Sequence, residues 1–259
     1  MNRHALPFAV VLAVPARPLD GPVRVVLTPQ KEPTGDVMEA ADYEGALGLL
    51  QLFAQAVNAQ IFSRDPAQPA QLEVDSVGWN DAAGVCELEA QARHLPAYAW
   101  AHLLAMLQKN HEAYEELARV VIESPGVSAP ISLPTLLGEV PQDLCDRDVG
   151  FIWSTAGSEK FRNIRLDVEF QDEIGAATLE ALEQDLSAWM QMVILGAFDL
   201  DFSPADDLDP LGTFKVTSPY RAECFVPYFQ GDMSGMVALE NLLQGTHRHR
   251  QAIAEAILE

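Results

Sequence analysis

An internal repeat constrains the fold of this chain more than any other feature of its sequence. Residues 8–32 (FAVVLAVPARPLDGPVRVVLTPQKE) align without a gap on residues 149–173 (VGFIWSTAGSEKFRNIRLDVEFQDE), and the alignment places Arg24 on Arg165. Apolar positions coincide along both stretches as well. Matches that recur in the same order indicate that one structural unit is written twice.

Each copy predicts the same succession of elements. It begins with two extended runs, in which Ile164–Phe170 (IRLDVEF) has the period of two that is typical of a strand, and we predict a β-hairpin there. An amphipathic helix and a second pair of strands follow. Long helices then close the copies over about residues 96–122 and 234–258, where LQKNH at 107–111 aligns with LQGTH at 243–247.

The repeat therefore predicts an α+β fold of two related β-β-α-β-β-α halves, with antiparallel sheets backed by helices. We assign residues 1–123 to the first half, 124–148 to a proline-containing connector and 149–259 to the second half. A chain of 259 residues with 49% hydrophobic content can bury a core of this size.

The chain is strongly acidic, with 38 Asp and Glu residues against 16 Lys and Arg residues and a formal net charge of -22. Such a balance repels phosphate backbones, so we expect no binding to nucleic acid. It attracts basic molecules, so we expect a protein partner and favour a basic one. The alternative is that the acidity reflects only the proteome of the host.

Cysteine content and hydropathy favour a soluble protein of a reducing compartment. Cys86, Cys145 and Cys224 are widely spaced and form no C-x-x-C pair, so they predict neither disulfides nor a thiolate zinc site. The apolar run at 5–14 resembles a signal peptide, but it has a counterpart in the second copy and we interpret it as a strand. No run reaches the roughly 20 apolar residues that cross a bilayer, and we expect a cytoplasmic protein.

One motif approaches a metal site. His111 and Glu115 come one residue short of the H-E-x-x-H pattern of zinc enzymes, because Glu115 stands where the second histidine would be. His111 also lies on the predicted apolar stripe of its helix, which favours a packed or interface histidine. The alternative is a metal-dependent enzyme that uses His111, Glu115 and carboxylates of an acidic loop.

That acidic loop matches no ion-binding pattern in full. Asp199, Asp201, Ser203, Asp207 and Asp209 place oxygen atoms at alternate positions, but the loop lacks the glycine and the final glutamate of an EF-hand. Glycine-rich phosphate loops and serine-nucleophile motifs are also missing from the sequence. We therefore predict no catalytic residues and no cofactor.

The segment from Val85 to Asn110 combines a strand, a Leu95-Pro96 helix start and a helix core that reads LLAMLQKN. In this combination it resembles class I chaperones of type III secretion, and the order of a helix followed by strands extends the resemblance over residues 43–110. The resemblance implies a cytoplasmic dimer that holds an unfolded segment of its partner without ATP and without catalytic residues.

These observations favour a non-catalytic protein that binds a protein partner, either as a chaperone-like carrier or as an inhibitor or immunity protein. Long helices carry more apolar surface than two small sheets cover, so we favour a homodimer over a monomer whose halves cover each other. The residues expected at the interface lie on the stripes of the two long helices: Trp100, Leu103, Leu107, Tyr114, Met236, Leu239 and Leu243.

Overall fold

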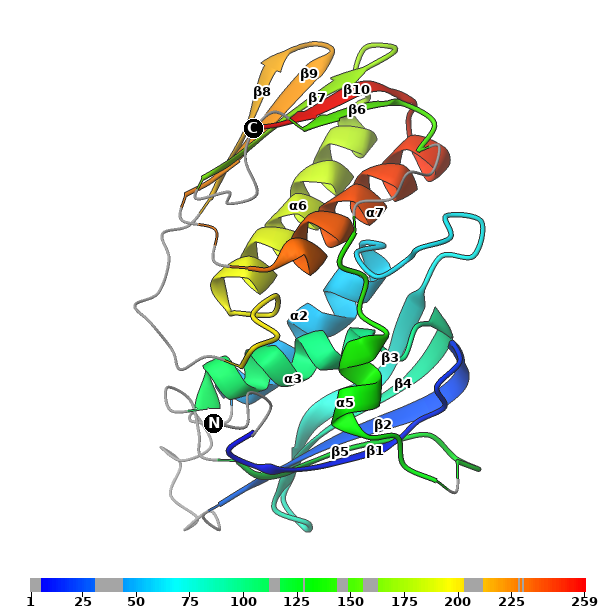
Figure 1. The fold of residues 1–259 in the computed structure, drawn as a ribbon, viewed down its shortest axis with the longest axis vertical. Coiled ribbons are helices and arrows are strands. Elements are labelled where there is room, and N and C mark those ends of the chain that lie inside the picture. The colour runs from blue at the N-terminus through cyan, green and yellow to red at the C-terminus, as the bar shows by residue number, and fades with distance from the viewer. Residues whose placement is uncertain are drawn as a thin grey trace.

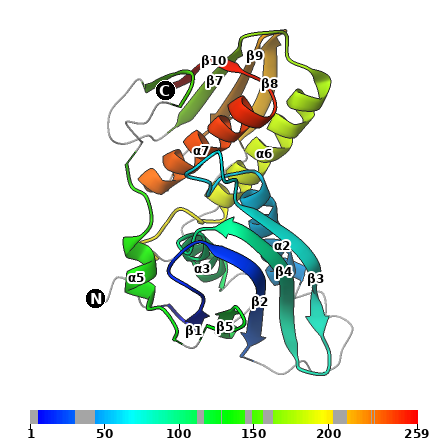
Figure 2. The ribbon, with the colours of Figure 1, turned by 90° about the vertical axis from the view of Figure 1, so that its right-hand side faces the viewer.

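The computed structural model describes residues 6–30, 44–111, 117–127, 129–143, 149–155, 163–202, 212–227, 229 and 231–259. Two sheets lie at opposite ends of the molecule and the principal helices lie between them (Figures 1 and 2). Among the helices in these ranges, none combines the length and the hydropathy needed to span a membrane.

The first half is one sheet with two helices on its inner face. Its elements, in chain order, are β1 (Ala9–Ala13), β2 (Leu19–Pro29), α2 (Glu44–Asn58), β3 (Gln71–Asn80), β4 (Val85–Leu95), α3 (Ala99–Lys109) and β5 (Leu117–Glu123). A connector that contains the short helix α5 (Leu133–Gly138) leads to the second half.

The second half repeats this order. Its elements are β6 (Ile152–Thr155), β7 (Ile164–Phe170), α6 (Ala176–Ile194), β8 (Thr213–Ser218), β9 (Arg221–Val226), α7 (Met233–His249) and β10 (Ile253–Leu258). The strands are ordered β1-β5-β2-β4-β3 in the first sheet and β6-β10-β7-β9-β8 in the second. The predicted α+β class with two similar halves is confirmed.

The strand registers of the two sheets agree as closely as their strand orders do. Val25 of β2 pairs with Ile122 of β5, and Leu166 of β7 pairs with Leu258 of β10. In each sheet the first strand runs parallel to the last, and the other neighbouring strands are antiparallel. Both sheets are therefore mixed, where the sequence predicted antiparallel ones. Equal registers are the strongest structural evidence for duplication.

The predicted hairpins at the start of each half are wrong in their pairing. β5 lies between β1 and β2, and β10 lies between β6 and β7. The gapless alignment of the two copies matches the equivalent positions of β2 and β7. In the first strands, β1 and β6, it differs from the structural equivalence by two residues. There Ala9 corresponds to Ile152, because these residues pair with Arg119 and Glu255 at equivalent positions of the last strands.

The long closing helices are shorter than predicted, because a strand follows each of them. Leu117 and Val121 are spaced four apart and fit a helical stripe, but the β-branched run around them folds as β5. A histidine bonds to the start of the strand that follows each helix: Nδ1 of His111 accepts a hydrogen bond from the Leu117 N–H (3.1 Å), and Nδ1 of His247 accepts one from the Ile253 N–H (2.9 Å).

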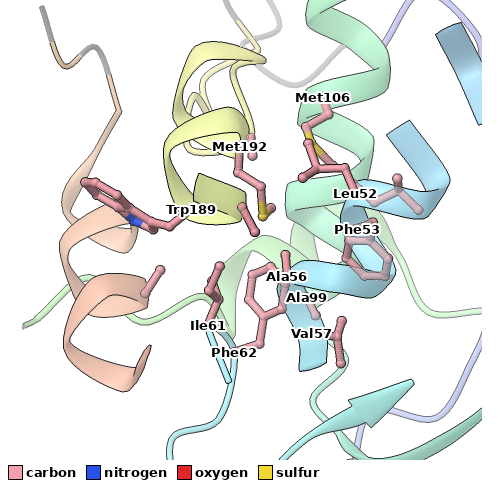
Figure 3. Close-up of a cluster of buried hydrophobic side chains, with 14 of the residues drawn as sticks. Leu52, Phe53, Ala56, Val57, Ile61, Phe62, Ala99, Met106, Trp189 and Met192 are labelled. Carbon is pink, nitrogen blue, oxygen red and sulfur yellow. The ribbon is translucent and has the colours of Figure 1, made fainter. Parts of the chain in front are cut away.

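The helices of the two halves form a shared core between the sheets. α2 packs against both α3 and α6, and α6 packs against α7. Figure 3 shows Leu52 and Ala56 of α2, Met106 of α3 and Met192 of α6 in one buried cluster. Because this core draws on both halves, separating them would expose a large apolar area.

Both edges of the first sheet have hydrogen-bonding partners elsewhere in the chain. At β1, the Leu12 carbonyl accepts a hydrogen bond from the Ile131 N–H of the connector (2.8 Å). At β3, the side chain of Asn58 bonds to both the N–H and the carbonyl of Leu72, at 2.9 and 3.0 Å. These contacts protect parts of the edges that would otherwise pair with other chains.

Candidate functional site

A polar network covers the outer face of the first sheet, which is turned away from the helices. Strand alternation buries Val23, Val25 and Leu27 of β2 and directs Arg24 outward. The same alternation in β4 directs Glu87 and Glu89 to this face. The network is thus assembled by cross-strand pairing.

Arg24 is the centre of the network. Its Nη2 lies 2.7 Å from Glu87 Oε1, its Nη1 lies 3.4 Å from Glu123 Oε1, and its Nε lies 4.0 Å from Glu89 Oε1. The hydrogen bond to Glu87 is the main reason that the pKa of Arg24 lies above its ordinary value. One guanidinium therefore faces three carboxylates.

A hollow of about 390 Å³ opens beside Arg24. Asp75, Glu89, Gln91 and Glu123 line it together with Arg24. The Asp75 carboxylate accepts a hydrogen bond from Gln91 Nε2 (3.0 Å), and the side chains of Glu89 and Glu123 are 55% and 44% exposed. The lining of this hollow thus includes more carboxylates than cations.

The second sheet carries the equivalent network with a different balance of charge. Arg165 Nη2 lies 2.8 Å from Glu223 Oε2, which reproduces the pair of Arg24 with Glu87. Lys215 Nζ lies 2.7 Å from Glu223 Oε1, and this hydrogen bond is the main reason that the pKa of Glu223 is lowered. Arg221 and Arg165 both approach Asp167. Three cations therefore share two carboxylates.

His111, the candidate metal ligand, is buried, and its Nδ1 accepts the hydrogen bond from the Leu117 N–H at the start of β5. Its ring also contacts that of Phe8, at 5.8 Å between centroids. Glu115 lies outside the described residues. Within the described ranges, no group of three or more histidine, cysteine, aspartate or glutamate side chains is arranged to hold a metal ion. The metal-dependent enzyme stays a prediction of the sequence.

Only the beginning of the acidic loop is described. Asp199 Oδ2 lies 3.8 Å from Lys109 Nζ, which links the second half to the end of α3. Asp201 is exposed. Ser203, Asp207 and Asp209 lie outside the described residues, so the structure does not test a ligand set in this loop.

The side chains expected at a dimer interface are buried inside the single chain. Six of them are at most 2% exposed, and they belong to the internal core: Trp100, Leu103, Leu107, Met236, Leu239 and Leu243. Tyr114 lies outside the described residues. The interface prediction is therefore wrong for these six, because the helices of the two halves and the sheets cover the stripes.

The thiols offer no reactive group in the described part of the chain. Cys86 and Cys224 form no disulfide with another described residue and are buried on the inner faces of β4 and β9. Burial raises the pKa of Cys224 to about 12, which keeps the thiol protonated at neutral pH. Cys145 lies outside the described residues.

Sequence reasoning missed most of the outer-face network. Arg24 drew attention only because it matches Arg165 in the repeat. The signal for the rest was the polar alternation in Glu87-Leu88-Glu89-Ala90-Gln91, which predicts an acidic strand face. Placing this face opposite Arg24 requires the strand register, which the sequence does not contain.

Comparisons with known proteins add no functional assignment. No family model matches the sequence, and no curated protein matches it either. The periplasmic protease PqqL from Escherichia coli has a TM-score of 0.24 and 9% identity, over 98% of this chain and 49% of its own, so the chain spans about half of that protein. Thermus thermophilus Cas6 has a TM-score of 0.18 and 13% identity, over 93% of this chain and 99% of its own. Neither similarity supports an argument.

Proposed function

We propose that this protein is a non-catalytic binding protein, a carrier or an inhibitor, that recognises a basic segment of a protein partner. The observation that carries the proposal is the hollow on the outer face of the first sheet, whose lining contains the carboxylates of Asp75, Glu89 and Glu123 but one guanidinium, that of Arg24. The net charge of -22 adds a long-range attraction for the same kind of partner.

Fold stability alone is a poor explanation for this arrangement. Exposed ion pairs contribute about 0–1 kcal/mol each, and mutual repulsion of three carboxylates reduces that gain. Glu89 is also poorly placed for Arg24, at 4.0 Å from its Nε. Carboxylates that are exposed and incompletely paired are available to a partner's lysine or arginine, and such contacts accelerate association at low salt.

The test is a co-purification from the native host with the tagged wild-type protein and the variant Glu89→Lys, followed by mass spectrometry. We expect a basic protein to be retained by the wild type at low salt and released as salt is raised, because screening weakens exposed charge contacts. The variant should retain much less of the same protein.

Glu183→Lys is the matched control, because it makes the same change of charge at an exposed position of α6 on the other half. It should retain the partner nearly as well as the wild type. Thermal melting of all three proteins checks that they are folded. Equal loss in both variants, or a partner whose retention does not depend on salt, would contradict the proposal.

A further inference from the structure

We infer that the outer face of the first sheet takes a lysine or arginine side chain of an extended partner segment, at the position that Lys215 fills in the second sheet. This inference rests on the proposed function and specifies the contact that recognition requires. It comes from comparing the two halves, because duplication supplies a second version of the same surface within one molecule.

The comparison depends on equivalent residues around one carboxylate. Glu87 of β4 is opposite Gly78 of β3, and Glu223 of β9 is opposite Lys215 of β8. Each glutamate also pairs with the arginine of the central strand, at 2.7 Å for Glu87 and 2.8 Å for Glu223. The halves therefore differ at the position opposite the glutamate, where one has glycine and the other has lysine.

The lysine changes the charge balance of the network. Glu223 has two cations, Lys215 and Arg165, at its two carboxylate oxygens. Among the described residues, Glu87 forms an ion pair with Arg24 alone, and its second polar contact is the neutral amide of Asn80 at 3.2 Å. The network of the first sheet therefore has one cation fewer around Glu87 than the network of the second sheet has around Glu223.

The local geometry leaves room for that cation. A Cβ atom built on Gly78 would have nothing within 4 Å, so the space above Gly78, opposite Glu87, is open, and the Glu87 side chain itself is 15% exposed. Glu89 lies two residues along β4 on the same face and borders the hollow. An extended segment places every second side chain on one side, so lysines at alternate positions would match Glu87 and Glu89 in turn.

The experiment measures binding of a labelled ten-residue peptide of alternating lysine and serine by fluorescence anisotropy at low salt. The decisive variant is Gly78→Lys, which supplies the missing ammonium from within the chain, as Lys215 does in the second sheet. The matched control is Gly48→Lys, because Gly48 is exposed on α2, has nothing within 4 Å of a built Cβ and lies on the helical side of the sheet.

We expect Gly78→Lys to weaken peptide binding about tenfold or more, while Gly48→Lys stays within about twofold of the wild type. Equal weakening in both variants would overturn the inference, because it would show attraction to net charge alone. So would a lysine peptide that binds no better than a matched peptide of glutamate and serine. If Glu89→Lys still releases the natural partner in those cases, the proposed function survives and only this contact is wrong.

Discussion

His102 makes the junction between the halves sensitive to acid. The ring is 2% exposed on α3 and stacks on Phe62, with 5.1 Å between centroids. Its Nδ1 bonds to the carbonyl of Ala197 in the second half (2.9 Å), which makes Nδ1 the protonated nitrogen of a neutral ring. Desolvation lowers the pKa of His102 from 6.5 to about 4, against the smaller opposing effects of the Ala197 carbonyl and Asp232.

The magnitude follows from linkage. A histidine whose pKa is lower in the folded state stabilises the fold above its unfolded pKa, and this contribution is lost as the pH falls from 6.5 towards about 4. One pKa unit corresponds to about 1.4 kcal/mol, so the full loss is about 3 kcal/mol, of which about 2 kcal/mol is lost by about pH 5. That is a substantial share of a typical stability of about 5–15 kcal/mol.

The assay is urea unfolding at several pH values between about 7 and 5, followed by the fluorescence of the buried Trp100 and Trp189. The variant His102→Asn keeps an amide donor near the Ala197 carbonyl but does not titrate. It should be less stable at pH 7 because it loses ring packing, and the difference from the wild type should shrink by about 2 kcal/mol by about pH 5. Carboxylates titrate equally in both proteins and cancel. A difference that stays constant with pH would refute the assignment.

Three further substitutions test single contacts. Asn58→Ala should cost about 1–3 kcal/mol in urea unfolding, because both backbone bonds to Leu72 are lost; an unchanged midpoint would show that water replaces them. Gly196→Ala should destabilise by about 1 kcal/mol or more, because Gly196 has a φ of 74°, and a stabilised protein would contradict this. His247→Ala should cost about 1–3 kcal/mol and speed hydrogen exchange at the Ile253 amide, and slow exchange there would contradict the turn contact.

The order of elements was largely predictable because it depends on local periodicity. The alternation in Ile164–Phe170 and the apolar stripe of residues 179–193 fall on β7 and α6. β5 was missed because Leu117 and Val121, four residues apart, fit the period of a helix as well as that of a strand. Whether this segment folds as a helix or a strand depends on pairing with strands far away in the sequence, since β5 completes its hydrogen bonds only between β1 and β2.

The pairing of the strands and the candidate site were not predictable, for a common physical reason. A strand that enters the sheet between two others changes the neighbours of both without changing any local pattern. Arg24, Glu87 and Glu123 are far apart in the sequence and meet only through the registers of β2, β4 and β5. The burial of Trp100 also depends on the other elements that pack around α3, so a stripe on one helix could not distinguish an internal core from a dimer interface.

The two copies differ in their contacts with each other and in the charges on their outer faces. α7 is buried from Ser234 to Thr246 and contacts the other half, where Asn241 Nδ2 donates to the Ile61 carbonyl (2.9 Å) and His249 Nε2 bonds to that of Pro66 (2.8 Å). In the sheet of the second half, Lys215 balances the carboxylates of the outer face from within the chain. The first sheet leaves carboxylates exposed around a hollow. Under the proposed function the open face of the first sheet is the recognition surface and the second half supports it, and this asymmetry is why Gly78→Lys is the most informative substitution.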